Sequence, residues 1–355
     1  MFSIRGLDVR AQAGNLIEVE NLFVSYATEH GAAGVLDGVS LAVRPGEIMG
    51  LVGESGCGKT TLANSILGIL PGNAACAGGT IRFRGENLLR LPARQVADEI
   101  RGRGITFIPQ DPFGSFNPLF PIGTQVMEVM KWKSPQRTAR ERRGIGGGLG
   151  GLLRRYPRAR RSADRGAVLA MLRSVQIPKP EQALRKLPHE FSGGQRQRLM
   201  IALALLPQPK LVIADEPTTA LDVTIQAQIL KLLKRLAKER GVAVLFTTHD
   251  LGTAYEICDR ITVMYAGQDV ETASVGDFFR RPHHPYTVRL LESLPRPGHE
   301  LRGIGGEIPA LVHPPPGCRF HPRCERASEP CRSERPPVTA LGGGHQVRCY
   351  NPMGT

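Results

Sequence analysis

A glycine-rich segment, Gly53-Glu-Ser-Gly-Cys-Gly-Lys59-Thr60, fits the pattern G-x-x-x-x-G-K-[ST] of loops that bind phosphate groups. It follows the apolar run Ile48–Val52 and precedes a segment of helical composition. Glycines let backbone N–H groups turn toward phosphate oxygens at the positive end of the following helix. Lys59 is predicted to neutralise the terminal phosphates of a nucleotide, and the Thr60 hydroxyl to bind Mg²⁺. The predicted nucleotide contacts of this segment are Gly53, Ser55, Gly56, Gly58, Lys59, Thr60 and Thr61.

Two carboxylates follow a second apolar run, in Leu211-Val-Ile-Ala-Asp215-Glu216. Ligands of open α/β sheets lie at the carboxyl ends of the strands, so this position places both acids beside a bound nucleotide. Asp215 is predicted to hold Mg²⁺, and Glu216 to polarise the water that attacks the terminal phosphate.

The segment Phe191-Ser192-Gly193-Gly194-Gln195 resembles the signature peptide of ATP-binding-cassette (ABC) ATPases, with phenylalanine where that family usually has leucine. In the family this peptide lies at a helix N-terminus and binds the γ-phosphate of a nucleotide held by the opposite subunit. A hydroxyl, exposed N–H groups and the helix dipole suit that task.

The other motifs of the family follow in order. The resemblance implies that Gln110 senses Mg²⁺ and water, that Ala220-Leu221-Asp222 faces a second subunit, and that His249 contacts the γ-phosphate. It also implies that Tyr26 stacks on adenine, with an ordinary strand aromatic as the alternative interpretation of that ring. The implied catalytic residues are Glu216, His249 and Gln110; the implied Mg²⁺ ligands are Thr60, Gln110 and Asp215; the further nucleotide contacts are Tyr26, Ser192, Gly193, Gly194, Gln195 and Asp222.

Four longer segments narrow the resemblance to the D-type ATPase of oligopeptide and dipeptide importers. They are Leu187–Gly194, Ile213–Gln228, Val263–Gly267 and His284–Thr287. This resemblance implies an ATP-hydrolysing subunit that drives uptake of dipeptides or oligopeptides, with nickel chelates or oligosaccharides as alternative cargo. It also implies a paralogous ATPase partner in a heterodimer, two transmembrane permease subunits, an external substrate-binding protein, and a peripheral place on the cytoplasmic face of the membrane.

Four cysteines, Cys318, Cys324, Cys331 and Cys349, cluster in a proline-rich tail. Four thiolates suit either tetrahedral Zn²⁺ or an iron–sulfur cluster, and their spacing does not choose between them. The resemblance to peptide-importer ATPases implies a [4Fe–4S] cluster on these ligands. His321 and His345 keep a mixed Cys/His zinc site open, and unliganded cysteines are a third interpretation.

Short apolar runs alternate with helical segments along the first part of the chain, which predicts an α/β domain with a largely parallel sheet. The expected strands are Leu16–Val19, Ile48–Val52, Ile105–Ile108, Leu211–Ala214, Val242–Thr247 and Arg260–Tyr265, and the expected helices are Lys59–Leu67, Gly194–Leu206 and Thr224–Arg240. With the resemblance, this predicts a P-loop NTPase core of the ABC type over residues 14–276. It is expected to carry an inserted helical subdomain over about 118–205, and a small loop-rich appendage over 277–355.

The basic excess of the chain, 46 Lys and Arg against 32 Asp and Glu, is concentrated in one place. Between Lys131 and Arg165 there are 12 basic and two acidic residues, so this stretch carries +10 of the formal +14. Its part rich in Arg and Gly, 140–165, is predicted to be a solvated loop, with a patch that touches anionic lipid head groups as the alternative.

A soluble ABC protein acting on nucleic acid is a second alternative for the whole chain. We do not expect it, because such proteins usually carry two cassettes and this sequence has one phosphate loop. No apolar run reaches the roughly 18 residues of a membrane span, and Met1–Asn15 lacks the pattern of a signal peptide, so a cytoplasmic location is expected.

Overall fold

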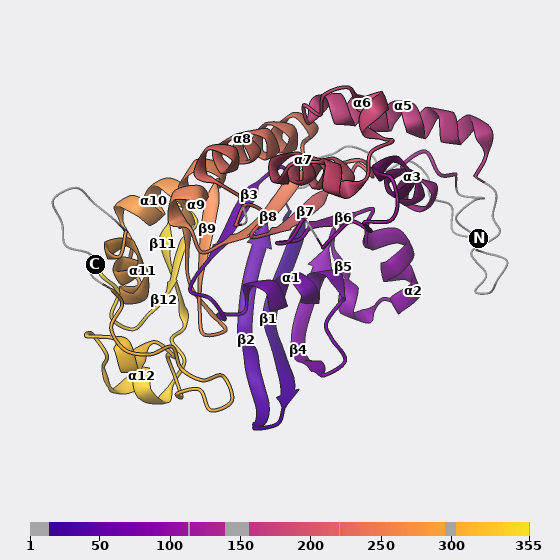
Figure 1. The fold of residues 1–355 in the computed structure, drawn as a ribbon. Helices are drawn as coiled ribbons and strands as arrows, with labels where there is room; N and C mark the ends of the chain where they lie inside the picture. Colours follow the sequence, from indigo (N-terminus) through magenta and orange to yellow (C-terminus); the bar gives the residue numbers. More distant parts are fainter. Residues whose placement is uncertain (1–13, 113, 139–155, 220, 295–302, 355) are drawn as a thin grey trace.

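The computed structural model describes residues 14–112, 114–138, 156–219, 221–294 and 303–354. Its strands form an eight-stranded sheet in the order β11-β12-β10-β9-β3-β8-β7-β6 and a four-stranded sheet in the order β2-β1-β4-β5 (Figure 1). Strands β6, β7, β8, β3 and β9 run parallel, and β10, β12 and β11 extend the sheet antiparallel at one edge. The larger sheet thus has the predicted parallel centre.

The larger sheet consists of β3 (Ile48–Val52), β6 (Ile105–Ile108), β7 (Leu211–Asp215), β8 (Ala243–Thr248), β9 (Arg260–Tyr265), β10 (Gln268–Ser274), β11 (Val338–Gly342) and β12 (His345–Arg348). The smaller sheet consists of β1 (Ile17–Thr28), β2 (Gly31–Val43), β4 (Ala74–Phe83) and β5 (Glu86–Asn87). The α-helices are α1 (Lys59–Leu67), α2 (Ala93–Gln95), α3 (Ile122–Lys133), α5 (Arg158–Ser174), α6 (Pro180–Ala183), α7 (Gly193–Leu205), α8 (Val223–Arg240), α9 (Leu251–Ile257), α10 (Val275–Arg280), α11 (Pro285–Glu292) and α12 (Glu329–Ser333).

Both faces of the central strands are buried, which explains why these strands are continuous apolar runs. On β3, Ile48 and Val52 join the core formed with helices α7, α8 and α9. Met49 and Leu51, which alternate with them, join the core formed with α1 and the smaller sheet. The sheet is therefore fixed from two sides, and the loops at its carboxyl edge are held on a rigid support.

The described residues between 118 and 205 contain helices α3, α5, α6 and α7 and no strand. The buried carboxylate of Asp164 joins two of these helices, since it accepts hydrogen bonds from Ser134 Oγ at 2.6 Å and Tyr156 Oη at 2.5 Å. The loop predicted over 140–165 lies outside the described residues as far as 155. Its last part differs from the prediction, because Arg158–Ser174 is helix α5 and buries Asp164 against α3.

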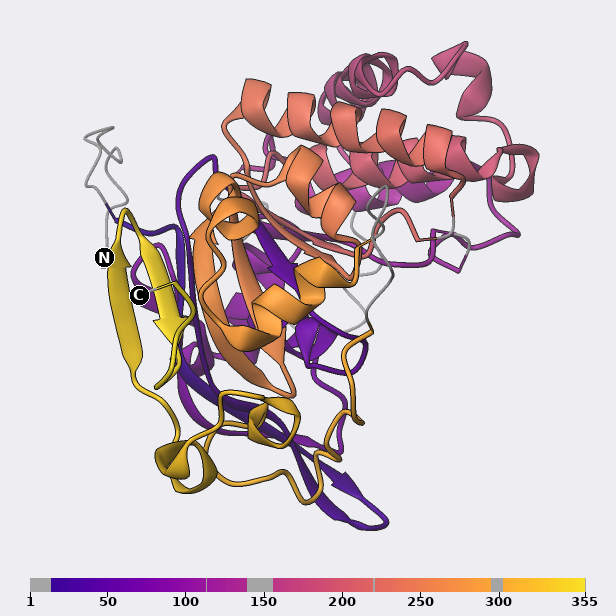
Figure 2. The ribbon, with the colours of Figure 1, turned by 90° about the vertical axis from the view of Figure 1, so that its left-hand side faces the viewer.

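The region after residue 277 packs on the main core. Tyr286 and Phe320 are buried and surround Tyr265 of β9, with ring centroids 4.6 Å and 5.1 Å from that of Tyr265. The hairpin β11–β12 pairs with β10 and lies at the outer edge of the larger sheet (Figure 2). The C-terminal region therefore shares the core of the first part of the chain, which its loop-like sequence did not indicate.

A buried polar cluster fixes the start of α11. The imidazole Nδ1 of His284 accepts a hydrogen bond from the backbone N–H of Tyr286 at 3.0 Å. The carboxylate of Glu271 accepts from the backbone N–H groups of His283 and His284, at 2.8 and 2.9 Å, and lies 2.7 Å from Nε2 of His345. Burial lowers the pKa of His284 to about 4.

We predict that His284 makes the protein less stable as the pH falls from about 6.5 toward 4. In this window the unfolded chain, in which a histidine has a pKa of about 6.5, binds a proton that the folded chain does not. The free energy of unfolding is thus higher above about pH 6.5 than below about pH 4 on account of this histidine. The difference is about 3 kcal/mol, at about 1.36 kcal/mol per pKa unit. His284→Asn keeps an acceptor for the Tyr286 N–H and removes the titrating group.

The melting temperature measured between pH 7.5 and 4.5 is therefore expected to fall more steeply for the wild type than for His284→Asn. Glu271, whose pKa is raised by burial but lowered overall by hydrogen bonds from His345, Thr287 and backbone N–H groups, remains in both proteins. Its acid titration thus cancels in the comparison. Parallel curves would assign the acid sensitivity to other groups.

Candidate nucleotide-binding site

The glycine-rich loop joins β3 to α1 in a conformation that needs glycine at two positions. Gly53 has φ +154°, and a Cβ atom there would lie 2.2 Å from the carbonyl oxygen of Met264. Gly58 has φ +106°, and its Cβ would lie 2.8 Å from the Leu36 side chain. At Gly53 the contact is with the backbone, and at Gly58 the positive φ would strain any residue that has a Cβ atom, so this backbone requires glycine at both positions.

Lys59, the first residue of α1, is folded back into the loop. Its side chain is 5% exposed, and its Nζ donates to the carbonyl oxygens of Gly53 at 2.8 Å and Glu54 at 3.1 Å. The same Nζ lies 3.9 Å from Glu216 Oε1. A fixed cation is thus present at the N-terminus of a helix, where the helix dipole also favours an anion.

A cavity of about 440 Å³ opens above this loop. It is lined by Tyr26, Val35, Ser55, Gly56, Gly58, Lys59, Thr60, Thr61, Gln110, Glu216 and Leu311. Tyr26 contributes an aromatic ring to the wall of the cavity, and its Oη lies 3.4 Å from Thr61 Oγ1. The structure therefore brings most of the predicted phosphate-loop contacts, the predicted aromatic and two predicted catalytic side chains around one space.

The two carboxylates are positioned by the pairing of β7 with β8. Asp215 lies opposite Thr247 in the register, and the Thr247 hydroxyl donates to the buried Asp215 carboxylate. The backbone N–H of Glu216 donates to the carbonyl oxygen of Thr247 at 3.1 Å. Glu216 has φ +43°, a left-handed conformation that is rare for a side chain of this size and typical of functional sites.

The carboxylate of Glu216 is the meeting point of the predicted catalytic residues. Its Oε2 lies 3.0 Å from Nδ1 of His249 and accepts from Nε2 of Gln110 at 3.4 Å. Glu216 is 16% exposed, whereas His249 is 55% exposed. A carboxylate held between an imidazole and an amide, beside Lys59, has the geometry of a base that accepts a proton from water.

The predicted signature residues do not line this cavity. Ser192 caps α7, since its Oγ accepts from the backbone N–H of Gln195 at 3.4 Å. In turn, the side-chain oxygen of Gln195 accepts from the backbone N–H of Ser192 at 3.2 Å. Gly193 and Gly194 form the first turn of this helix. Asp222 caps α8 by accepting from the backbone N–H of Ile225 at 2.9 Å. Ala220, which belongs to the same predicted motif as Asp222, lies outside the described residues.

Sequence reasoning missed three residues of the site. The Thr247 hydroxyl donates to the Asp215 carboxylate and accepts from the backbone N–H of Glu216, and the strand run that ends in Thr247 and Thr248 was the available signal. Val35 and Leu311 complete the wall of the cavity near Tyr26. Leu311 lies in a proline-rich segment without apolar periodicity, so nothing in the sequence distinguished it.

The predicted iron–sulfur cluster is wrong. Among the residues that the structure describes, no group of three or more His, Cys, Asp or Glu side chains is arranged to hold a metal ion. The thiols have other partners or surroundings: Cys318 and Cys331 belong to the hydrophobic core, and Cys349 Sγ accepts from the backbone N–H of Asn351 at 3.3 Å. Burial raises the pKa of Cys318 to about 12 and that of Cys349 to about 11, which favours neutral thiols over thiolate ligands.

The zinc alternative fails on the same finding. Nε2 of His345 lies 2.7 Å from Glu271, and Nδ1 of His321 lies 3.0 Å from the carbonyl oxygen of Cys318. Both imidazoles thus have partners within the fold.

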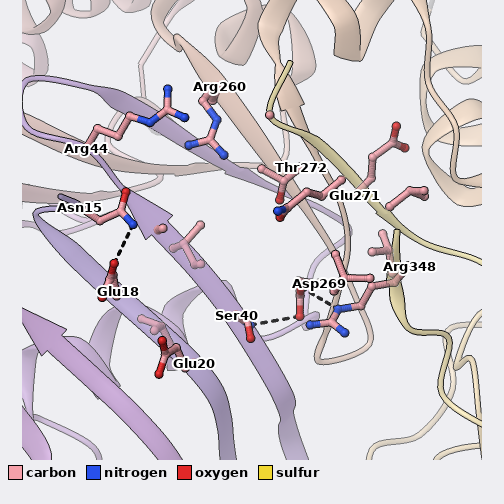
Figure 3. A pocket seen from close by; sticks show the side chains of 18 residues that line it. Asn15, Glu18, Glu20, Ser40, Arg44, Arg260, Asp269, Glu271, Thr272 and Arg348 are labelled. Carbon is pink, nitrogen blue, oxygen red and sulfur yellow. Dashed lines mark hydrogen bonds and ion pairs between the residues drawn. The ribbon is translucent and has the colours of Figure 1, made fainter. Parts of the chain in front are cut away.

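A second cavity, of about 360 Å³, lies between the smaller sheet, β10 and the C-terminal hairpin (Figure 3). Its walls carry Arg44, Arg260 and Arg348 as well as acidic side chains, and Arg348 Nε donates to Asp269 Oδ2 at 2.9 Å. Asp269 also accepts from the backbone N–H of Ser40 at 3.2 Å. None of its lining residues belongs to the predicted site, and the Arg348–Asp269 contact attaches the hairpin to the core.

None of the helices in the described ranges is both long enough and apolar enough to cross a bilayer.

Comparison with known proteins gives two family matches. Residues 36–219 match the ABC transporter family, and residues 270–331 match the family described as oligopeptide/dipeptide transporter, C-terminal region. The chain is 44% identical to a probable peptide ABC transporter ATP-binding protein, y4tR, of Sinorhizobium fredii, over 96% of each chain. It is 42% identical to the dipeptide transport ATP-binding protein DppD of Bacillus subtilis, over 94% of each, and 40% identical to the oligopeptide transport ATP-binding protein OppD of Salmonella typhimurium, over 96% of this chain and 95% of the relative.

Solved structures agree on the fold. The dimeric ATP-binding cassette MJ0796, bound to ADP and phosphate, is 26% identical with a TM-score of 0.58, and the match covers 73% of this chain and 98% of the cassette. The cassette cbiO1 of Clostridium perfringens is 25% identical with a TM-score of 0.58, over 76% of this chain and 92% of its own length. These likenesses confirm the predicted P-loop NTPase core of the ABC type, and the predicted C-terminal appendage stays a prediction.

Proposed function

This chain belongs to the family of ATP-binding subunits of ABC transporters, and from that premise we propose that it hydrolyses ATP to drive the import of dipeptides or oligopeptides. The observation that carries the ATPase role is the Glu216 carboxylate, which lies 3.0 Å from His249 and 3.9 Å from Lys59 at the wall of the cavity. The names of the relatives, which transport peptides, dipeptides and oligopeptides, support the cargo.

The geometry supports the following roles. The loop N–H groups and Lys59 bind the phosphates of ATP, and Tyr26 contacts the base. The water oxygen forms a bond to the γ-phosphorus while the bond to the β–γ bridging oxygen breaks, and ADP and phosphate result. Glu216 accepts the proton of the water, and Gln110 and His249 hold the Glu216 carboxylate in place.

Thr60, Gln110 and Asp215 would hold Mg²⁺, because hydroxyl, amide and carboxylate oxygens are the donors that this ion takes in proteins. The donor set fits: Thr60 and Gln110 line the cavity, and the Asp215 carboxylate is fixed at the end of β7 by Thr247. When bound, the ion neutralises charge that develops on the phosphates.

The site of one chain is incomplete in this proposal. Ser192, Gly193, Gly194, Gln195 and Asp222 lie outside the cavity, which supports a role at the nucleotide of a second ATPase subunit. The solved MJ0796 cassette is a dimer, which favours such an arrangement. We take the second subunit to be a paralogue of this chain. The two ATPase subunits would bind two transmembrane permease subunits, to which an external substrate-binding protein delivers the peptide. The chain is then peripheral, on the cytoplasmic face of the membrane.

The domain division goes with these roles. Residues 14–276 form the ATPase domain in this proposal, with the helical region 118–205 facing the permease, and residues 277–355 form the C-terminal region. The match of residues 270–331 to a C-terminal region of oligopeptide and dipeptide transporters favours a boundary near 277.

The test is the ATPase rate of the chain reconstituted with its partner ATPase, permease subunits and binding protein. We expect peptide-loaded binding protein to stimulate hydrolysis more than empty binding protein does, as a coupled importer requires. Hydrolysis without stimulation by any peptide would leave the ATPase role and overturn the peptide cargo. Absence of hydrolysis in the full complex would overturn both.

A further inference from the structure

Two described side chains of the C-terminal region, Tyr286 and Arg323, contact Glu54 of the phosphate loop. The backbone N–H of Glu54 donates to Tyr286 Oη at 3.1 Å. Its carboxylate lies 3.1 Å from Nη1 of Arg323, which is separated from it by 269 residues in the sequence. The Arg323 side chain is 4% exposed and that of Glu54 24%, so the cation of this pair is shielded from water more than its carboxylate is.

The same residue contacts the cation of the nucleotide site. The carbonyl oxygen of Glu54 accepts from Lys59 Nζ at 3.1 Å and from the backbone N–H of Cys57 at 3.3 Å. Glu54 thus connects the C-terminal region to Lys59 through the backbone of one residue. A displacement of Glu54 would move a hydrogen-bond partner of the lysine.

Arg323 is itself held in a fixed position. Its Nε donates to the carbonyl oxygen of Gly305 at 2.8 Å, its Nη2 to that of Ile304 at 3.0 Å, and its Nη1 to Tyr265 Oη at 3.2 Å. These bonds leave the guanidinium little freedom, and a preorganised cation loses little entropy when it neutralises Glu54.

The charge of Glu54 bears on the binding of phosphate in the nucleotide site. Glu54 is the second residue of the loop that is expected to surround phosphates, and an uncompensated carboxylate there repels an anionic ligand. Arg323 neutralises that charge without lining the cavity itself. Without Arg323 the loop would keep the Glu54 charge beside the bound phosphates.

A second part of the C-terminal region lies in the cavity wall. Leu311 lines the cavity together with Tyr26 and Val35, and its carbonyl oxygen accepts from the backbone N–H of Gly34 at 2.9 Å. The buried Arg319 fixes this approach, because its Nη1 donates to the carbonyl oxygen of Gly34 at 3.1 Å and to that of Ala266.

We propose that the C-terminal region is part of the nucleotide site: Arg323 acts as a positioning residue that neutralises and holds Glu54, and Leu311 supplies an apolar contact to the bound nucleotide. This inference rests on the nucleotide site proposed above. It gives residues 303–354 a task in nucleotide affinity.

The test measures the Kd of the full-length chain for a fluorescent ATP analogue with Mg²⁺. Arg323→Met leaves Glu54 unpaired, and we expect its Kd to rise about 10-fold, the scale of losing a charged hydrogen bond. The double variant Arg323→Met with Glu54→Gln removes both charges, and its Kd is expected to return close to the wild-type value. A purely structural role of Arg323 would not give this recovery.

Arg348→Met is the matched control. Arg348 is also a C-terminal arginine paired with a core carboxylate, Asp269, and is 14% exposed, but it lies at the cavity of Figure 3, away from the phosphate loop. Its Kd is expected to stay at the wild-type value. For the second contact, Leu311→Ala is expected to weaken binding several-fold and Ile308→Ala, at an exposed side chain of the same segment, to leave it unchanged.

Three outcomes decide the matter. Equal Kd values for the wild type and Arg323→Met overturn the inference alone. So does an equal loss of affinity and of melting temperature in Arg323→Met and Arg348→Met, because it would show a general effect of loosening the C-terminal region. No binding by the wild type would overturn the proposed function and the inference with it.

Discussion

Replacing Glu216 with glutamine leaves ATP bound and reduces its hydrolysis by about 10²–10³-fold, the scale of losing a positioned general base. Glutamine has the shape of glutamate and can still meet Gln110 and His249, which contact the Glu216 carboxylate at 3.4 and 3.0 Å. It cannot accept the proton of the attacking water. The turnover number falls, therefore, while the affinity for ATP is kept or increased, since the carboxylate charge beside the phosphates is gone.

Steady-state ATPase rates of the reconstituted complex, together with nucleotide binding by the chain alone, measure these two quantities separately. Glu239→Gln is the matched control, because Glu239 is exposed on α8, pairs with Arg235 at 3.1 Å and does not line the cavity. Its rate is expected to equal that of the wild type. Wild-type turnover in Glu216→Gln would remove Glu216 from the role of base.

Several of the parallel strands were predictable because burial leaves a run of mostly apolar residues in the sequence. The predicted bounds of β3, β6 and β9 agree with the structure, and so do those of α1. Each of these strands is a short apolar run next to a glycine or polar loop. Strand β1 was predicted to end at Val19 and continues to Thr28. Register shifts follow Val19, and Asn21 has φ +47°, so a bulge interrupts the alternation on which the prediction depended.

The site residues on the loops of the parallel strands were predictable for a related reason. Asp215 ends a buried strand, and Lys59 and His249 come after buried strands. The carboxyl ends of parallel strands meet at one edge of the sheet. The type and order of the motifs thus placed them together. The contacts of Arg323 and Leu311 depend on how the C-terminal region docks, and no local pattern encodes a contact across 269 residues.

The C-terminal region gave the largest errors. Its hairpin β11–β12 turns at Gly343 and Gly344, which have φ +60° and +81°. Adjacent glycines indicate such a turn, and the prediction of a loop-rich appendage did not use this signal. The cysteine spacing indicated ligand types without fixing where the thiols lie. Two of them, Cys318 and Cys331, pack into the hydrophobic core, a location that metal-ligand reasoning from spacing alone does not consider.

Replacing Lys59 with methionine is expected to raise the Kd for ATP by about 100-fold. Methionine fills the space of a side chain that is 5% exposed, but it carries no charge. A hydrogen bond to a charged group contributes up to about 3 kcal/mol, and each 1.4 kcal/mol is about tenfold in Kd. This loss exceeds that expected for Arg323→Met, because Lys59 faces the cavity and Arg323 acts through Glu54.

Titration with a fluorescent ATP analogue checks this value, and the melting temperature separates it from unfolding. Lys231→Met is the control, since Lys231 is exposed on α8 and lies outside the site. Lys59→Met also removes the donor to the carbonyl oxygens of Gly53 and Glu54. The affinity for ADP, which retains the β-phosphate, is therefore expected to fall as well. Unchanged ATP binding in a folded Lys59→Met protein would mean that the loop holds phosphate through its N–H groups alone. The cation would then serve the structure of the loop, and the electrostatic part of the proposed site would be wrong.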